Sequence, residues 1–126
     1  MSITRVLSVL SLPLLLCGCI SNSVVNLTPR QAVRTPDNLY LVEARWKSNE
    51  QALRPDSLEP KVMIGRQFHP MDRTPNTENR WEALVPGPAT GRFLNYRFKV
   101  DYLYNAIPIP RRDSKLSPTF QLEIID

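Results

Sequence analysis

The placement of proline restricts the fold of this 126-residue chain more than any other feature. All of the prolines except Pro13 are spread between residues 29 and 118, and the longest stretch without one in that region is residues 89–107. Proline inside a helix removes a backbone hydrogen bond and clashes with the preceding turn. This spacing therefore leaves little room for helices and favours short strands joined by turns.

Apolar and polar residues alternate between the prolines, with the period of two that is typical of half-buried strands. The clearest example is residues 93–104, where the apolar positions are Leu94, Tyr96, Phe98, Val100 and Tyr102. The same pattern predicts strands at residues 23–27, 39–47, 61–67, 80–85 and 119–125, and one helical turn is expected within residues 49–53. One polar face on each strand indicates mainly antiparallel sheets.

About six or seven strands in roughly 100 residues are typical of an all-β sandwich. Trp46 on the second predicted strand and the alternating aromatic strand from Tyr96 to Tyr102 resemble immunoglobulin-like domains of the fibronectin and early-set type. The resemblance implies an Ig-like antiparallel β-sandwich over residues 23–126. A small barrel is the alternative, and the inter-sheet disulfide of antibody domains is absent because both cysteines precede residue 20.

The first nineteen residues have a different character, with Arg5 as their one charge. The apolar run at residues 6–16 is too short for a membrane-spanning helix, which needs roughly 20 residues. It has the length of the apolar region of a secretory signal peptide, about 7–15 residues. We therefore expect residues 1–18 to be a cleaved signal peptide.

Leu16-Cys17-Gly18-Cys19 follows that run and resembles the lipobox of bacterial lipoproteins. The resemblance implies cleavage before Cys19 and attachment of lipid to its sulfur, with no acidic retention signal in the Ile20 that follows. It implies attachment to the outer membrane, on the periplasmic or the surface face. Cys17 is an unusual residue for its position, and an ordinary signal peptide with chance cysteines is the alternative.

Residues 19–22 would then be the lipidated N-terminus and a short tether to the domain at residues 23–126. The three residues after the cysteine span at most about 11 Å. The domain would therefore lie against the membrane, which favours a partner that is also held there.

Few residues are available for catalysis. His69, the one histidine, is expected in a loop beside Pro70, where packing is a simpler role than ligation. A zinc site would need further ligands, and a serine–histidine–acid triad would need His69 itself. We therefore expect no catalytic residue, no metal site and no cofactor, and a protein that is not an enzyme.

Trp81 is a candidate binding residue with two interpretations. The segment from Trp81 through the turn to the strand at residues 96–100 resembles part of the starch-binding and glycogen-binding early-set modules. In those families tryptophans stack on sugar rings, so the resemblance implies a carbohydrate-binding module at the cell surface. Alternation with Ala83 and Val85 instead favours a place for Trp81 in the core.

Cations supply the other candidate binding residues. Arg97 and Lys99 are expected on the solvent face of their strand, where Glu123 could oppose one of them. Arg111 and Arg112 are expected in a long, proline-flanked loop at residues 111–115, preceded by the exposed isoleucines Ile107 and Ile109. Loops on a rigid scaffold commonly carry binding residues, although a plain connector or a solvated face is the alternative.

The net charge of the chain is only +4, and no block of like charges occurs, so nucleic acid is not an expected partner. The sequence thus predicts a membrane-anchored lipoprotein of the cell envelope that acts as a non-enzymatic interaction or structural module. Its expected partners are the membrane, through the lipid, and another envelope protein or a glycan.

Overall fold

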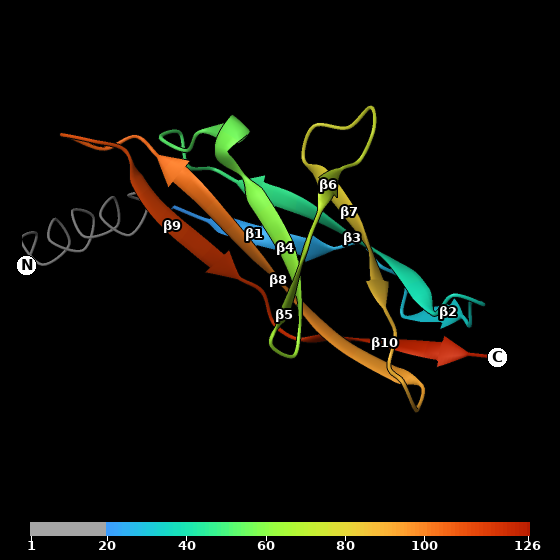
Figure 1. Ribbon diagram of the computed structural model, residues 1–126. Helices are drawn as coiled ribbons and strands as arrows, with labels where there is room; N and C mark the ends of the chain where they lie inside the picture. The colour runs from blue at the N-terminus through green and yellow to red at the C-terminus, as the bar shows by residue number, and fades with distance from the viewer. Residues whose placement is uncertain (1–19) are drawn as a thin grey trace, which may run out of the picture.

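The structure is a computed structural model that describes residues 20–126 and is built almost entirely from β-strands (Figure 1). The predicted signal peptide and Cys19 lie outside the described residues. The elements in chain order are β1 (Asn22–Asn26), β2 (Gln31–Val33), β3 (Leu39–Ser48), the 3-10 turn η1 (Pro55–Ser57), β4 (Glu59–Ile64), β5 (Gln67–Pro70), β6 (Asp72–Arg73), β7 (Arg80–Pro86), β8 (Phe93–Tyr104), β9 (Arg111–Leu116) and β10 (Phe120–Ile125).

Two sheets form the domain, as the predicted all-β sandwich requires. The first has the strand order β1-β3-β7-β6, and its neighbours are all antiparallel. The second has the order β2-β10-β8-β4-β5, with β9 also paired to β8. The fold class is therefore confirmed.

Strand β8 organises the second sheet because one of its edges serves two partners in succession. Its first residues pair with β10 (Phe93 with Glu123), and its last residues pair with β9 (Tyr104 with Arg111). The buried Ser117 lies between β9 and β10 and bridges the break. Its backbone N–H donates to the Phe98 carbonyl at 2.9 Å, and its hydroxyl accepts from the Phe98 N–H at 2.8 Å.

One pairing departs from the antiparallel expectation. Strand β2, which was not predicted, pairs in parallel with β10, so that Gln31 lies opposite Glu123. Three residues between two prolines carry too little alternation to be recognised as a strand. The pairing nevertheless places β10 in the interior of the sheet, between β2 and β8.

The core lies between the two sheets, and the strands supply it as their alternation predicted. Every second residue of β3, β7 and β8 is buried. Trp46 of β3 contacts Tyr102 of β8 with ring centroids 5.5 Å apart, which joins the sheets at one end. Asn22 and Asn26 of β1 add polar links, because their amides donate to the hydroxyls of Tyr102 (3.0 Å) and Tyr96 (2.9 Å).

Four local predictions are wrong. Residues 111–115 form part of strand β9 and are not a loop, and the helical turn is at Pro55–Ser57 and not at 49–53. The strand predicted at residues 61–67 ends at Ile64, because the chain turns at Gly65 with a φ of 60° and returns as β5. His69 consequently lies in strand β5, opposite Val62, and not in a loop.

Within residues 20–126, the structure has no helix that is long and apolar enough to cross a membrane.

Candidate functional site

Trp81 belongs to the core. Its side chain is 5% exposed, it lies opposite Ala44 in the first sheet, and the Arg73 guanidinium covers its ring at 5.2 Å from the centroid. A ring that is buried and covered cannot stack on a sugar. The candidate binding role of Trp81 is therefore wrong, and the alternative that placed it in the core is correct.

Arg97 and Lys99 lie on the outward face of β8, as predicted, but Glu123 opposes neither of them. Glu123 lies opposite Phe93, and the Gln31 side chain donates to its carboxylate at 3.4 Å. Lys99 instead pairs with Asp101, with Nζ 3.7 Å from the carboxylate. The expected cross-strand pair fails because β10 reaches only the first residues of β8.

Lys99 is one member of a small cluster on this face. Lys61 of β4 lies directly opposite it and binds the same carboxylate of Asp101 at 3.5 Å. Both ammonium groups also lie over the ring of Phe68, 5.8 and 5.9 Å from its centroid. Lys61, Phe68 and Asp101 were not among the binding residues predicted from the sequence, although the alternation of β8 already placed Asp101 on the same face as Lys99.

Arg97 is separate from this cluster. It lies opposite Met63, and its Nε is buried with no hydrogen-bond partner among the described residues.

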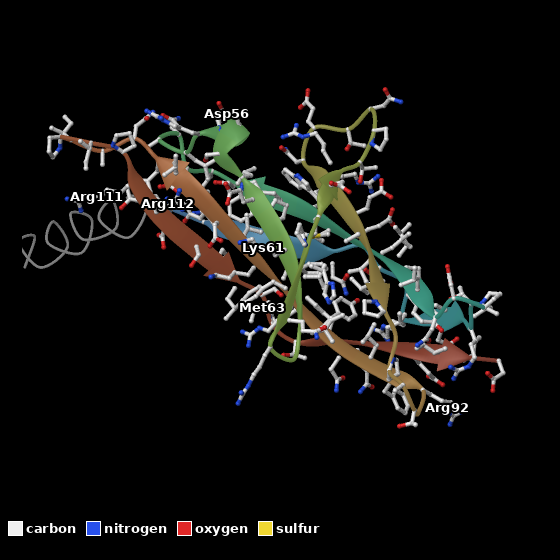
Figure 2. All side chains as sticks on the ribbon, in the orientation of Figure 1. Asp56, Lys61, Met63, Arg92, Arg111 and Arg112 are labelled. Carbon is white, nitrogen blue, oxygen red and sulfur yellow. The ribbon has the colours of Figure 1, made fainter. Side chains whose placement is uncertain are left out.

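Arg111 and Arg112 occupy the first positions of β9, opposite Tyr104 and Leu103. Both side chains are exposed, and no carboxylate of residues 20–126 lies within ion-pair distance of either guanidinium. They lie at the opposite end of the molecule from Arg92 (Figure 2). The structure thus leaves both charges available to a ligand, on a strand and not on the predicted loop.

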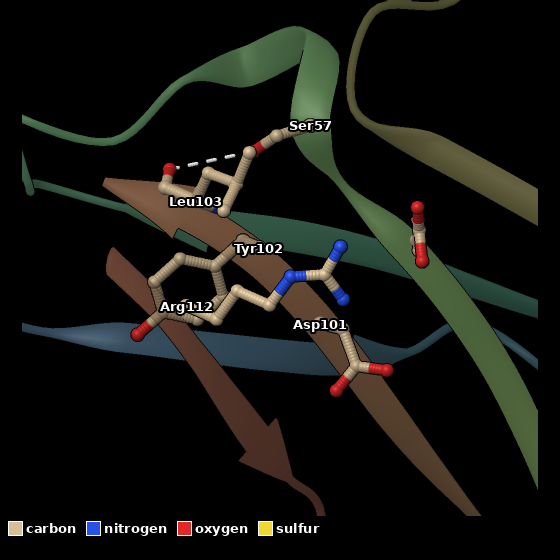
Figure 3. Close-up of a pocket in the computed structure, with 6 residues that line it drawn as sticks. Ser57, Asp101, Tyr102, Leu103 and Arg112 are labelled. Carbon is tan, nitrogen blue, oxygen red and sulfur yellow. Dashed lines mark hydrogen bonds between the residues drawn. The ribbon is translucent and has the colours of Figure 1, made fainter. Parts of the chain in front are cut away.

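A small cavity lies beside Arg112. It measures about 80 Å³ and is lined by Ser57, Glu59, Asp101, Tyr102, Leu103 and Arg112 (Figure 3). The Ser57 hydroxyl accepts from the Leu103 N–H at 2.8 Å and donates to the Leu103 carbonyl at 3.3 Å, so it fastens η1 to β8. Ligand pockets usually measure about 300–1,000 Å³, so this cavity is too small for a small-molecule substrate.

The hydroxyl of Tyr102 has a pKa that is raised above its ordinary value. Burial raises the pKa of its hydroxyl, and the nearby carboxylates of Asp113 and Glu50 raise it further, against the lowering effect of the hydrogen bond from Asn22. The neutral hydroxyl is therefore favoured in the folded protein. Its role is structural, because it links β8 to β1.

The connection between β8 and β9 is the most exposed apolar feature of this end. Residues 105–110 read Asn-Ala-Ile-Pro-Ile-Pro, and the side chains of Ile107 and Ile109 are 95% and 66% exposed, as the sequence indicated. The base of the connection is fixed, because the Asn105 N–H donates to Ala52 at 2.7 Å and Arg54 donates to the Asn105 side chain at 2.8 Å. We call residues 105–110 the apolar hairpin tip.

Among residues 20–126, no group of three or more His, Cys, Asp or Glu residues is arranged to hold a metal ion. His69 is half-buried, and its Nε2 has no hydrogen-bond partner among these residues.

Comparison of the sequence with models of known protein families and with curated proteins gave no match.

Proposed function

We propose that the protein is a non-enzymatic lipoprotein of the cell envelope, held at the membrane by lipid on Cys19, whose domain acts as an interaction or structural module. The lipobox-like sequence before Ile20 is the basis of the anchor. The exposed Arg111 and Arg112, which have no ion-pair partner among the described residues, and the cluster around Phe68 provide surfaces for contact.

The short distance between Cys19 and the folded domain is the observation that best supports the proposal. Ser21 is already part of the domain, because its N–H donates to the Asn49 side chain at 2.6 Å and its carbonyl accepts from the Asn49 N–H at 3.1 Å. Only Ile20 then separates Cys19 from the folded domain, a reach of about 7 Å. Lipid on Cys19 would hold the domain directly against the bilayer, where a partner in the same membrane can meet it.

Metabolic labelling with a radioactive fatty acid tests the anchor. The wild-type chain should incorporate label and stay with the membrane fraction, because two or more acyl chains hold a protein stably where one does not. Cys19→Ser should abolish both, whereas Cys17→Ser should keep the label on Cys19. An unlabelled wild-type protein, or label that survives in Cys19→Ser, would contradict the proposal.

In a bacterium with two membranes, we propose the outer membrane as the location, since Ile20 is not an acidic retention signal. Separation of inner and outer membranes by density should place the wild type in the outer fraction, and Ile20→Asp tests whether that residue decides the sorting.

A photo-crosslinking residue at position 68 should capture an envelope protein, and the same residue at the exposed position 90 is the matched control.

A further inference from the structure

The apolar hairpin tip has features that suit an apolar surface better than water. Ile107 and Ile109 are 95% and 66% exposed and lie two residues apart, and contiguous exposed apolar patches commonly mark interaction sites. Residues 105–110 carry no charged side chain, and Pro108 and Pro110 have no backbone N–H. Burial of this segment among acyl chains would therefore bury no charged side chain, and two of its residues would have no backbone donor to lose a partner.

The hairpin tip lies at the end of the molecule where the chain enters β1. Tyr104 and Arg111 pair at its base, and Tyr102 accepts from Asn22, the first residue of β1. Figure 1 shows the connection between β8 and β9 projecting past the start of β1, away from the end where β10 finishes. A domain tethered through the residue before Ile20 would turn this end toward the bilayer.

Charge at the base of the hairpin tip fits phospholipid headgroups. Arg111 and Arg112 follow Pro110 directly, and neither has a carboxylate of the described residues within ion-pair distance. Two of the nearby carboxylates have other partners: Glu50 accepts from Asn22 at 2.9 Å, and Asp113 accepts from the Ser114 N–H at 2.8 Å. Arginine binds phosphate well because its planar donors match the phosphate oxygens.

We propose that the apolar hairpin tip inserts into the phospholipid surface that carries the lipid anchor, with Ile107 and Ile109 among the acyl chains and Arg111 and Arg112 on the headgroup phosphates. The anchor alone would be one pivot. A second attachment at the same end would fix the orientation of the domain, so that the outward faces of both sheets stand away from the bilayer. The choice of membrane rests on the proposed function, but the lipid affinity of the tip does not.

Flotation with vesicles tests this affinity without the anchor. A chain that begins at Ile20 keeps every strand and core residue described here, so it is the form to use. With vesicles of phosphatidylethanolamine and phosphatidylglycerol in equal parts, the wild type should float. Ile107→Ser/Ile109→Ser should weaken binding about ten-fold or more, because it removes two large apolar groups from the lipid.

Matched variants separate insertion from general stickiness. Val33→Ser/Leu84→Ser removes two side chains that are 66% and 61% exposed on other strands, and it should float like the wild type. Arg111→Gln/Arg112→Gln should also weaken binding and reduce its sensitivity to salt. Circular dichroism should show the same strand content in all four chains.

Three results would overturn the inference: no flotation of the wild type, equal loss in the Val33/Leu84 control, or full binding by the Ile107/Ile109 variant. Loss of a protein crosslink in that variant, with no lipid binding by the wild type, would show a protein partner at the tip instead. Fatty-acid labelling at Cys19 is measured separately on the full chain. Label on the full chain, together with no flotation of the chain that begins at Ile20, would overturn this inference and leave the proposed function standing.

Discussion

Ser117 is the residue that makes one continuous edge out of two strands. Its hydroxyl accepts from the buried Phe98 N–H at the point where β9 stops and β10 has not begun. We expect Ser117→Ala to lower the free energy of unfolding by about 1–3 kcal/mol, because the Phe98 N–H would lose a partner in the interior. Urea denaturation measures this loss.

Ser114→Ala is the matched control, since Ser114 is exposed on β9 and its side chain donates to no group of the described residues. Its free energy of unfolding should stay within about 0.5 kcal/mol of the wild type. Equal stability of the two variants would show that the Ser117 hydroxyl is not needed to bridge the break.

The raised pKa of Tyr102 predicts that the stability of the fold decreases at alkaline pH. Its pKa is raised above 10.0 in the folded protein by burial and by the carboxylates of Asp113 and Glu50. The native state keeps the hydroxyl proton at a pH where the unfolded chain has lost it, so stability is full below pH 10 and falls as the pH rises through the folded pKa.

Denaturation measured at a series of pH values should show this decline for the wild type and a weaker one for Tyr102→Phe. Tyr104→Phe is the control, and it should keep the decline. An unchanged slope in Tyr102→Phe would show that other groups cause the alkaline loss.

The sequence could place single residues on faces but could not say what lies over them. Alternation correctly put Lys99 outward and correctly favoured the core for Trp81. It could not predict that Lys61 and Phe68 meet Lys99, because that contact depends on the turn at Gly65 and on the register of β4 against β8. Such contacts join distant parts of the chain.

At the scale of elements, β9 shows why a strand can escape recognition. All six of its residues are exposed, so no alternation marks it, and its sequence Arg-Arg-Asp-Ser-Lys-Leu reads like a loop. Charged residues are common on edge strands because they discourage pairing with a second chain. The segment is therefore a strand on account of its β8 partner, and its own sequence gives little sign of it.

In the turn between β7 and β8, the structure predicts that Gly87 cannot be replaced by a residue with a side chain without loss of stability. A Cβ at this position would lie 2.5 Å from Tyr40 Cε2 and 2.7 Å from Asn38 Oδ1, and the Gly87 N–H already donates to the Asn38 carbonyl at 2.8 Å. Tyr40 is buried and cannot move freely. We expect Gly87→Ala to cost about 1–3 kcal/mol of stability through overpacking.

Thermal unfolding measures this cost, and Thr90→Ala, on the exposed part of the same turn, should leave the melting temperature nearly unchanged. A Gly87→Ala protein as stable as the wild type would show that the β3–β7 end relaxes to admit the methyl group.

For the whole molecule, the sequence predicted the class of the fold and the residues of its core, because alternation is set by the pleat of each strand alone. The order of the strands within each sheet could not be predicted from the sequence. Nothing in residues 31–33 signals that they pair in parallel with residues 123–125, since the two segments are joined only by tertiary packing. The Ig-like assignment rests on resemblance and stays a prediction.

The interior position of β10 predicts that its loss is not tolerated. Removal of residues 119–126 would leave β2 without a partner and expose the edge of β8 over the core, so we expect a chain with no cooperative unfolding transition in urea. Removal of Asp126 alone loses only its exposed ion pair with Arg34, which is worth less than about 1 kcal/mol. Cooperative unfolding of the longer truncation would contradict the central role of β10.

The pairing of β2 with β10 also sets an order in time. The Gln31 and Glu123 side chains that meet across it are 92 positions apart in the sequence. During synthesis, β2 and β8 are therefore made before β10, the strand that lies between them in the sheet. Folds dominated by such distant pairings form slowly. The second sheet can be completed only after residues 120–125 have been synthesised, and until then β2 and the first residues of β8 lack the strand with which they pair.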